Sequence, residues 1–382
     1  MKNEYFASTV AEVQTRWDRV VRRRSFLKGL GAVGVAGAAV VPVGSMTATA
    51  AGAGQGTLSS GDVAVLRFLA AAEILESDLW TQYSELGGAA GGNPSYIAAL
   101  QNIDGDMPQY ITDNTDDELS HAAFLNAYLS AHGAPVVNLD RFRTLPSSRA
   151  TGARQIGRLT NLLALDVDTS WYTRYRSDEN PDLGDTFAQA ITIRNEPAIP
   201  LNDVDTPPNT AQPVPPLTRA ARRMQAIANT AAFHFAMIEQ GGSSLYTTMS
   251  QKVTSLEVLR IVVSIGGVEV DHFSLWHDKV GATISQPLAG VTDPETGLTF
   301  PDFNNPGGEL RQTNKILPEP CEFLNEVLPL CSVIRPSSVQ NAGAVASFMA
   351  LKADRLFQGQ SQEFLDTVLG LAQAADAAHR QL

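Results

Sequence analysis

Two short segments of the chain carry a carboxylate and an imidazole at the same spacing. Glu118 is followed three residues later by His121, and Glu269 is followed three residues later by His272. Residues three apart in a helix lie on one face, so each glutamate and its histidine can reach the same point. Carboxylate oxygens and imidazole nitrogens suit divalent metals such as iron and manganese. The two segments therefore predict metal ligation inside a helical protein.

Further glutamates precede each of these two segments, on stretches whose apolar residues recur at helical spacing. Glu73 and Glu76 come before the first segment, and Glu239 comes before the second. An uncompensated carboxylate in an apolar core costs several kcal/mol, so glutamates on apolar stripes need a partner. Two divalent ions placed close together repel each other, and four carboxylates supply the negative charge that holds them. The order of these residues predicts a site for two metal ions.

The first helix offers two candidates for a single ligand position. Glu73 and Glu76 lie on the same apolar stripe. Glu76 and Glu239 are each followed seven residues later by a tyrosine, and this parallel favours Glu76 as the ligand. Glu73 is instead followed at that spacing by Trp80, which favours Glu73. Both glutamates therefore stay on the list of candidate ligands, with Glu76 preferred.

Four long helices must position these side chains. Their apolar periodicity and flanking Ser, Thr, Gly and Pro residues predict the starts and ends of the helices. Thr115 is expected to begin the second helix, and the aspartates that flank it are read as charges near that helix's N-terminus. The predicted fold class is all-α, a four-helix bundle. The predicted helices span residues 60–87, 115–133, 218–246 and 255–276.

Two regions fall outside the helix pairs of the bundle. Residues 138–217 form a long insertion between the second and third helices, with one expected helix at 156–176 and a segment rich in Pro, Asn and Asp. Residues 281–382 form a C-terminal extension that is first rich in loops and then helical. The expected bundle domain is 60–280, and no stretch of the chain predicts a strand-rich sheet.

The ligand order resembles that of the ferritin-like superfamily. In di-metal members of that superfamily, a Glu from each of two helices and a Glu-x-x-His segment from each of the other two face the bundle interior. The stretch SLEVLRIVVSIGGVEVDHFSLWHD is similar to the last bundle helix of members related to the plant desiccation-induced group. The similarity covers about 60–130 and 218–280.

This resemblance implies a cofactor of two iron ions, or manganese ions, that react with O2 or peroxide. It implies that Glu118 and Glu269 bridge the two metals, while His121 and His272 bind one metal each. Glu76 and Glu239 would be terminal ligands. A homodimer is one assembly that the resemblance allows. The alternative function is a non-enzymatic protein of the cell envelope, related to stress or desiccation, in which the metal is structural or absent.

The N-terminus has the features of an export signal. Arg22, Arg23 and Arg24 precede Phe-Leu-Lys, and the run that follows from 29 to 43 carries no charge. This run is shorter than the roughly 20 apolar residues that span a bilayer. The segment resembles a twin-arginine signal that covers 1–50. The resemblance implies that the twin-arginine export machinery is a partner and that the folded protein becomes periplasmic or extracellular.

Composition and charge exclude one class of partner. The 382 residues include 28 Lys and Arg against 40 Asp and Glu, which gives a formal net charge of −12. Without the first fifty residues the balance is 21 basic against 37 acidic side chains. Binding to nucleic acid depends on clustered basic side chains that neutralise phosphates. We therefore expect no nucleic-acid partner.

The chain has two cysteines, Cys321 and Cys331, and neither has the spacing of a metal site. In an exported protein they are expected either to form a disulfide or to remain two buried thiols. The sequence leaves both states open.

Overall fold

The structure is a computed structural model of the whole chain. The predicted export signal at 1–50, and Cys321 with its question of a disulfide to Cys331, lie outside the residues that the structure describes. The described residues are 58–169, 191–205, 218–302, 318–319, 331–332 and 342–381.

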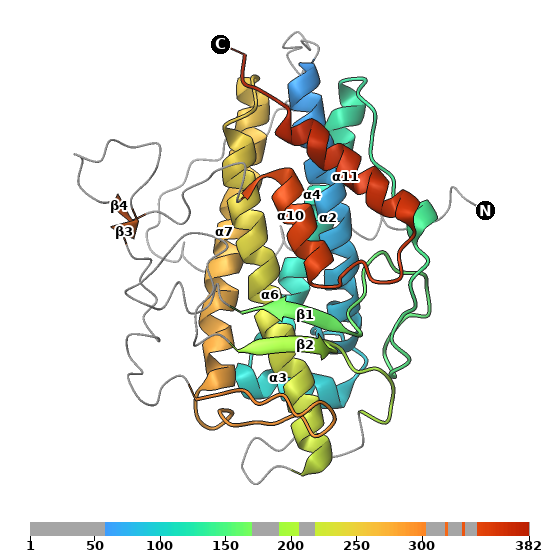
Figure 1. Ribbon diagram of the computed structural model, residues 1–382, viewed down its shortest axis with the longest axis vertical. Coiled ribbons are helices and arrows are strands. Elements are labelled where there is room, and N and C mark those ends of the chain that lie inside the picture. The colour runs from blue at the N-terminus through green and yellow to red at the C-terminus, as the bar shows by residue number, and fades with distance from the viewer. Residues whose placement is uncertain are drawn as a thin grey trace, which may run out of the picture. The chain divides into compact units, whose positions relative to one another are not determined.

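Four long helices run side by side (Figure 1). Helix α2 packs closely against α4, and α6 packs closely against α7. Their side chains form the interior of a four-helix bundle, so the predicted all-α fold is confirmed. The bounds are α2 Ser60–Gly87, α4 Met107–Ala131, α6 Arg219–Ser250 and α7 Leu256–Val280.

Three of these helices begin at the hydroxyl residues that the sequence offers as caps. The side chains of Ser59, Thr218 and Ser255 each accept a hydrogen bond from the backbone N–H three residues ahead. Such a cap satisfies a donor that has no partner inside the helix and stabilises the helix by about 1 kcal/mol. These caps set the starts of α2, α6 and α7.

Helix α4 begins earlier than the sequence predicted. It starts at Met107 with Pro108 in its first turn, a position that suits proline because no N–H is needed there. Thr115 lies inside the helix, where its hydroxyl donates to the carbonyl of Ile111 at 2.6 Å. A threonine that bonds back along its own helix satisfies its hydroxyl as well as a capping threonine does, so the prediction at Thr115 was wrong. Asp117 consequently lies in the middle of α4.

The predicted helix at 156–176 is wrong over its described part. Residues 156–164 are irregular, and Leu165–Asp168 form strand β1, which pairs antiparallel with β2, Thr192–Glu196. A second short antiparallel pair joins β3, Pro318–Glu319, to β4, Cys331–Ser332. The described part of the chain therefore contains two small two-stranded sheets that the sequence did not predict.

A buried carboxylate on α2 explains the non-helical path of the insertion. Asp78 accepts hydrogen bonds from the backbone N–H groups of Leu159 at 3.0 Å and Thr160 at 2.9 Å. Its other oxygen lies 2.6 Å from Arg143 Nη1. These bonds use backbone donors that a helix would have paired internally, and they fasten the insertion to the bundle.

Three shorter helices complete the described chain, together with 3-10 turns at Asp140–Phe142 and Gly281–Ile284. Helix α3, Pro94–Ile103, packs on α6, while α10, Ala344–Ala353, packs on α11, Gln362–Asp376. Helix α11 crosses α2 near the upper end of the bundle (Figure 1). The carboxylate of Asp376 caps α10, because each of its oxygens accepts a backbone N–H of the first turn at 2.9 Å.

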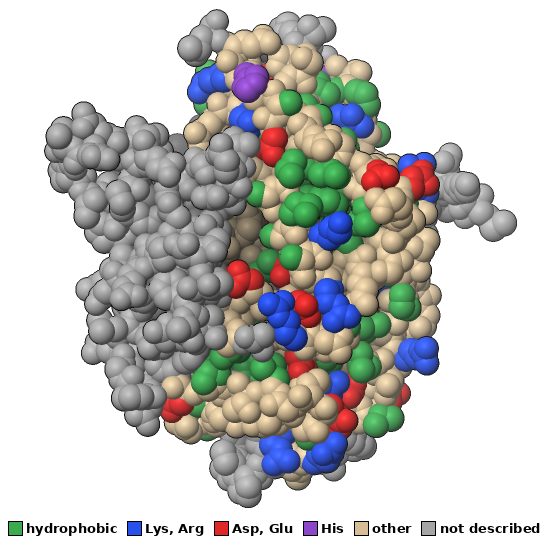
Figure 2. Space-filling view, viewed as in Figure 1, with side chains coloured by type: hydrophobic (Ala, Val, Ile, Leu, Met, Phe, Trp, Pro, Cys, Tyr) green, Lys and Arg blue, Asp and Glu red, His purple; other side chains and the backbone are tan. Residues whose placement is uncertain are grey.

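The surface around the paired strands β1 and β2 carries charges of both signs. Figure 2 shows Lys and Arg interspersed with Asp and Glu on the described part of this face. Asp166 lies 3.3 Å from Arg194 and 3.6 Å from Arg355. Exposed ion pairs of this kind contribute little to stability. Within the described ranges, no helix has both the length and the apolar character to cross a membrane.

Aromatic side chains fill the bundle interior beside the candidate site. Trp80 from α2 and Trp276 from α7 are fully buried, with ring centroids 5.4 Å apart. Phe235 from α6 stacks on Trp80 at 4.9 Å. Three helices are thus tied together at one level, which fixes the angles at which they present their neighbouring polar residues.

Candidate metal centre

Six of the seven candidate ligands meet inside the bundle, and each of the four long helices contributes at least one of them. They form two overlapping groups in which the candidate ligand atoms lie within 4.8 Å of one another. All six residues are buried. The first group is Glu73, Glu118, His121 and Glu269, and the second is Glu118, Glu239, Glu269 and His272.

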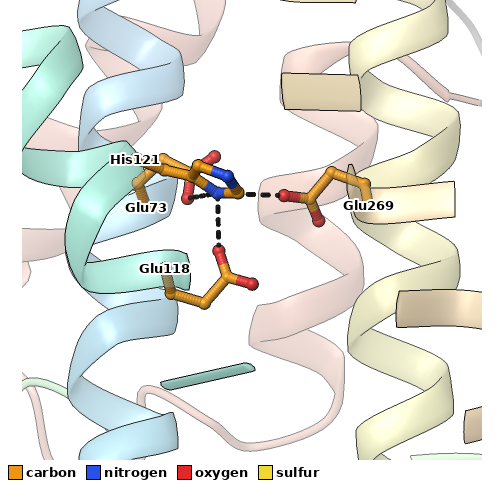
Figure 3. A group of neighbouring side chains, drawn as sticks. All are labelled: Glu73, Glu118, His121 and Glu269. Carbon is orange, nitrogen blue, oxygen red and sulfur yellow. Dashed lines mark hydrogen bonds and ion pairs between the residues drawn. The ribbon is translucent and has the colours of Figure 1, made fainter. Parts of the chain in front are cut away.

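In the first group, three carboxylates converge on one imidazole nitrogen (Figure 3). His121 Nδ1 lies 3.1 Å from Glu118 Oε2 and 3.4 Å from Glu73 Oε2. Its distance to Glu269 Oε1 is 3.5 Å. The three glutamates come from three different helices, so the group forms only when the bundle is assembled.

The second group repeats this arrangement around the other imidazole. His272 Nδ1 lies 3.1 Å from Glu118 Oε1 and 3.3 Å from Glu239 Oε2. Glu118 thus turns one oxygen to each imidazole. Glu118 and Glu269 belong to both groups, whereas the other four residues belong to one group each.

Glu76 is the candidate that the structure leaves outside both groups. The residue as a whole has intermediate exposure, one turn along α2 from Glu73, although its carboxyl group is buried. Burial of its carboxyl and the charges of Glu269, Glu73 and the other nearby glutamates raise its pKa well above the ordinary value. The geometry places Glu73, and not the preferred Glu76, at the position that α2 contributes.

Two of the grouped residues have outer partners that fix their orientation. The hydroxyl of Tyr246 donates a short hydrogen bond to Glu73 Oε1. His272 Nε2 lies 3.1 Å from Asp117 Oδ2, so this imidazole is held on the side away from the group. Carboxylates that hold the outer nitrogen of a ligating histidine are a common feature of metal sites. Sequence reasoning missed this role of Asp117, because it placed the residue at the helix start.

Asn114 is a further functional residue that sequence reasoning missed. Its amide nitrogen donates to Glu118 Oε1 at 2.8 Å and to Glu239 Oε1 at 3.0 Å. Its amide oxygen accepts a hydrogen bond from Trp276 Nε1 at 2.7 Å. A signal was present in the sequence, since Asn114 stands four residues before Glu118 and therefore on the same helix face.

Burial and mutual repulsion shift the acid–base properties of the groups. Burial raises the pKa of Glu73 to about 7, and it also raises the pKa values of Glu239 and Glu269. Close contacts with both imidazoles, each at 3.1 Å, overcome the effect of burial and lower the pKa of Glu118. Burial alone would lower the pKa of His121, but the surrounding carboxylates raise it. These carboxylates therefore favour bound positive charge, whether protons or metal ions.

Buried ligand atoms that lack a hydrogen-bond partner indicate whether a pair of metal ions fits this site. Within the described part of the chain, Glu73 Oε2, Glu239 Oε2 and both carboxylate oxygens of Glu269 have no hydrogen-bond partner. His272 Nδ1 also has none. Buried polar atoms without partners cost about 1–3 kcal/mol each. Four carboxylates and two imidazoles match the charge and ligand preferences of two divalent iron or manganese ions, so the residues fit the pair.

Gly242 leaves the space that Glu269 occupies, and this gives a testable prediction. A Cβ at Gly242 would overlap Glu269 Oε2, whereas a Cβ at the neighbouring Gly241 meets nothing within 4 Å. Gly242→Ala is expected to displace this carboxylate and weaken metal binding by about 10-fold or more, the scale of losing a ligand's support. Gly241→Ala is expected to leave binding unchanged and to stabilise α6 by roughly 0.5–1 kcal/mol. Metal titration against a competing chelator and thermal melting measure the two effects.

Equal binding by the two alanine variants would contradict the role assigned to Gly242. Loss of folding in Gly242→Ala, seen by circular dichroism of the metal-free protein, would show that the glycine serves helix packing instead.

Comparison with protein families places the bundle in a known group. Residues 61–282 match the model of a family described as ferritin-like domain. This match covers more than half of the chain and includes all four bundle helices with both groups of candidate ligands. No curated protein and no solved structure matches the chain significantly.

Proposed function

Because the chain belongs to the ferritin-like domain family, we propose that it binds a pair of iron or manganese ions between its four bundle helices. The observation that carries this proposal is the pair of overlapping groups that share Glu118 and Glu269. Two carboxylates common to both groups are what a pair of neighbouring cations needs, because each shared carboxylate reduces the repulsion between the ions.

The residues divide between two metal positions. Glu73 and His121 would hold one ion, and Glu239 and His272 would hold the other. Glu118 and Glu269 would contact both. We refer to these as the His121 position and the His272 position. Both imidazoles turn Nδ1 inward, so each would ligate through that nitrogen.

The proposed activity is an oxidoreductase reaction with O2 or peroxide. A bound iron or manganese pair supplies the one-electron steps that amino-acid side chains lack. The chain contributes a dry, rigid surrounding, since Trp80, Trp276 and Phe235 pack beside the site without solvent exposure. Asn114, Asp117 and Tyr246 hold the ligating side chains in fixed orientations.

The N-terminal arginine motif supports a proposal about location. We propose that the twin-arginine machinery exports the folded protein and that it acts in the periplasm or outside the cell. This route suits a metalloprotein, because the metal would be inserted before the folded chain crosses the membrane. Replacing Arg23 and Arg24 with lysines should retain the protein in the cytoplasm of a host with that machinery, as fractionation would show.

The first experiment is a measurement of metal content. The protein is made in medium with iron and manganese, purified without chelator, and analysed for metals. Two iron or manganese ions per chain are expected, and O2 and peroxide consumption by the reduced, metal-loaded protein then tests the reaction. Absence of metal, both as purified and after anaerobic titration with Fe2+ or Mn2+, would overturn the proposal. It would leave the alternative of a non-enzymatic envelope protein on the same scaffold.

A further inference from the structure

The two proposed metal positions have different outer partners. The carboxylates at the His272 position accept hydrogen bonds from an amide, Asn114, whereas the carboxylate of Glu73 at the His121 position accepts one from a phenol, Tyr246. We propose that Asn114 is a positioning residue for the His272 position alone, and that Tyr246 serves the His121 position alone. This inference rests on the proposed function and adds that the two metal positions are chemically unequal.

Trp276 determines which way the Asn114 amide faces. An indole nitrogen only donates hydrogen bonds, so the atom of Asn114 that lies 2.7 Å from Trp276 Nε1 must be the amide oxygen. The amide NH2 group must then face the carboxylates. Asn114, Trp276 and the carboxylates that Asn114 contacts are all buried. The indole thus ensures that Asn114 presents two N–H donors to the site.

Both N–H donors of Asn114 bond to carboxylate oxygens that belong to the His272 position. One reaches Glu239 Oε1, which belongs to the second group only. The other reaches Glu118 Oε1, the oxygen that lies 3.1 Å from His272 Nδ1. The oxygen of Glu118 that faces His121 is Oε2, and Asn114 does not contact it. The amide therefore orients the carboxylates around the His272 position.

Tyr246 acts on the opposite side. Its hydroxyl bonds to Glu73 Oε1, and Glu73 belongs to the first group only. Its position is fixed by the close passage of α7, because a Cβ at Gly266 would lie 2.8 Å from Tyr246 Cβ. A neutral phenol with one donor and an amide with two donors polarise their carboxylates differently. We infer that the two ions are held with different affinities.

The test measures each position separately. His121→Ala leaves the ligands of the His272 position, and His272→Ala leaves those of the His121 position. Mn2+ is titrated into each background, and free Mn2+ is counted by its EPR signal. Adding Asn114→Leu should weaken Mn2+ binding by about 10- to 100-fold in the His121→Ala background. In the His272→Ala background it should change binding much less, because the Glu118 oxygen that faces His121 is Oε2, and Asn114 donates to Oε1.

Tyr246→Phe should give the reverse pattern in the same two backgrounds. Tyr83→Phe is the matched control, because the Tyr83 hydroxyl contacts His234 at 2.7 Å and no member of either group. It should change Mn2+ binding in neither background. A general effect of removing a buried phenol would instead appear in both tyrosine variants.

Trp276→Phe provides a second route to the same inference. It keeps an aromatic ring in the core but removes the N–H that orients Asn114, so it should weaken Mn2+ binding in the His121→Ala background only. If Asn114→Leu does not fold, Mn2+ binding by Trp276→Phe tests the role of Asn114.

Two outcomes would overturn the inference, and they are distinguishable from failure of the proposed function. If Asn114→Leu or Trp276→Phe lowers Mn2+ affinity equally in both backgrounds, Asn114 has a general structural role and does not position one metal site. Unchanged binding in both backgrounds would show no role at the metal. If the wild-type protein binds no Mn2+ at all, the proposed function fails and this inference fails with it.

Discussion

Replacing Glu118 with alanine is expected to abolish metal binding at both positions, whereas Glu239→Ala is expected to abolish it at one. Glu118 has one oxygen 3.1 Å from each imidazole nitrogen, and it belongs to both groups. Glu239 belongs only to the group around His272. The predicted metal content is therefore two ions per chain in the wild type, about one in Glu239→Ala and none in Glu118→Ala.

The loss of metal affinity in Glu118→Ala is expected to be large because Glu118 would contact both ions. Loss of an outer partner costs about 10- to 100-fold in metal affinity, and loss of a ligand shared by both ions should exceed that at each position. Removing Glu118 also removes one negative charge from between two cations, which increases their repulsion. Metal analysis after purification and anaerobic Mn2+ titration of all three proteins measure the difference.

Glu363→Ala is the matched control for removing a glutamate. This side chain is 66% exposed on α11, paired with Arg141, and its loss should leave two ions per chain. If Glu118→Ala and Glu239→Ala lose the same number of ions, the assignment of Glu118 as a shared ligand is wrong. Circular dichroism of the metal-free proteins separates loss of ligands from loss of fold.

The sequence predicted the bundle because its signals are local. Hydroxyl caps at Ser59, Thr218 and Ser255 and the apolar periodicity between them depend on residues only a few positions apart. The Glu-x-x-His spacing likewise depends on one turn of helix, so the grouping of Glu118 with His121 could be foreseen from the sequence alone.

Long-range contacts explain where the structure differs from the predictions made from the sequence. The path of residues 156–168 is set by Asp78, about eighty residues earlier in the chain, and no local pattern reveals that bond. The choice between Glu73 and Glu76 depends on the angle at which α2 packs in the bundle, since both lie on one stripe. Asn114 was overlooked because the search for ligands considered only carboxylates and imidazoles.

The metal-free protein is expected to lose stability as the pH rises from about 5 to 8. Burial raises the pKa of Glu73 from 4.5 to about 7, so the folded state binds more protons than the unfolded state in that interval. The free energy of unfolding then falls with rising pH, by about 2.5 kcal/mol from Glu73 alone. Glu239, Glu269 and both histidines have pKa values raised in the same direction.

Glu118 has the opposite effect on the pH dependence of stability. The pKa of Glu118 is lowered, so its contribution is present above its unfolded value of 4.5 and is lost as the pH falls through its folded value. Its effect is confined to pH values below about 5. The groups with raised pKa values determine the trend between pH 5 and 8, and stability of the metal-free protein should be greatest near pH 5.

Metal binding should reverse this dependence. Two divalent ions replace the protons that the carboxylates would otherwise retain, and protons compete with metal more strongly at low pH. Stabilisation by Mn2+ should therefore be small at pH 5.5 and large at pH 8.0. Melting temperatures of the metal-free and Mn2+-loaded protein at these two pH values measure both trends. The metal-free protein should melt lower at pH 8.0 than at pH 5.5, and the loaded protein should not.

Glu73→Gln isolates one contribution to this pH dependence. The amide has the shape of the carboxyl group but does not ionise, so the metal-free variant should lose less stability than the wild type between pH 5.5 and 8.0, by about 2 kcal/mol. A metal-free wild type whose melting temperature is constant or rises over this interval would contradict the prediction. It would mean that the glutamates are not held close together without metal. The bundle would then form its site only as the ions bind, and the unsatisfied carboxylates would belong to the metal-bound shape of the protein.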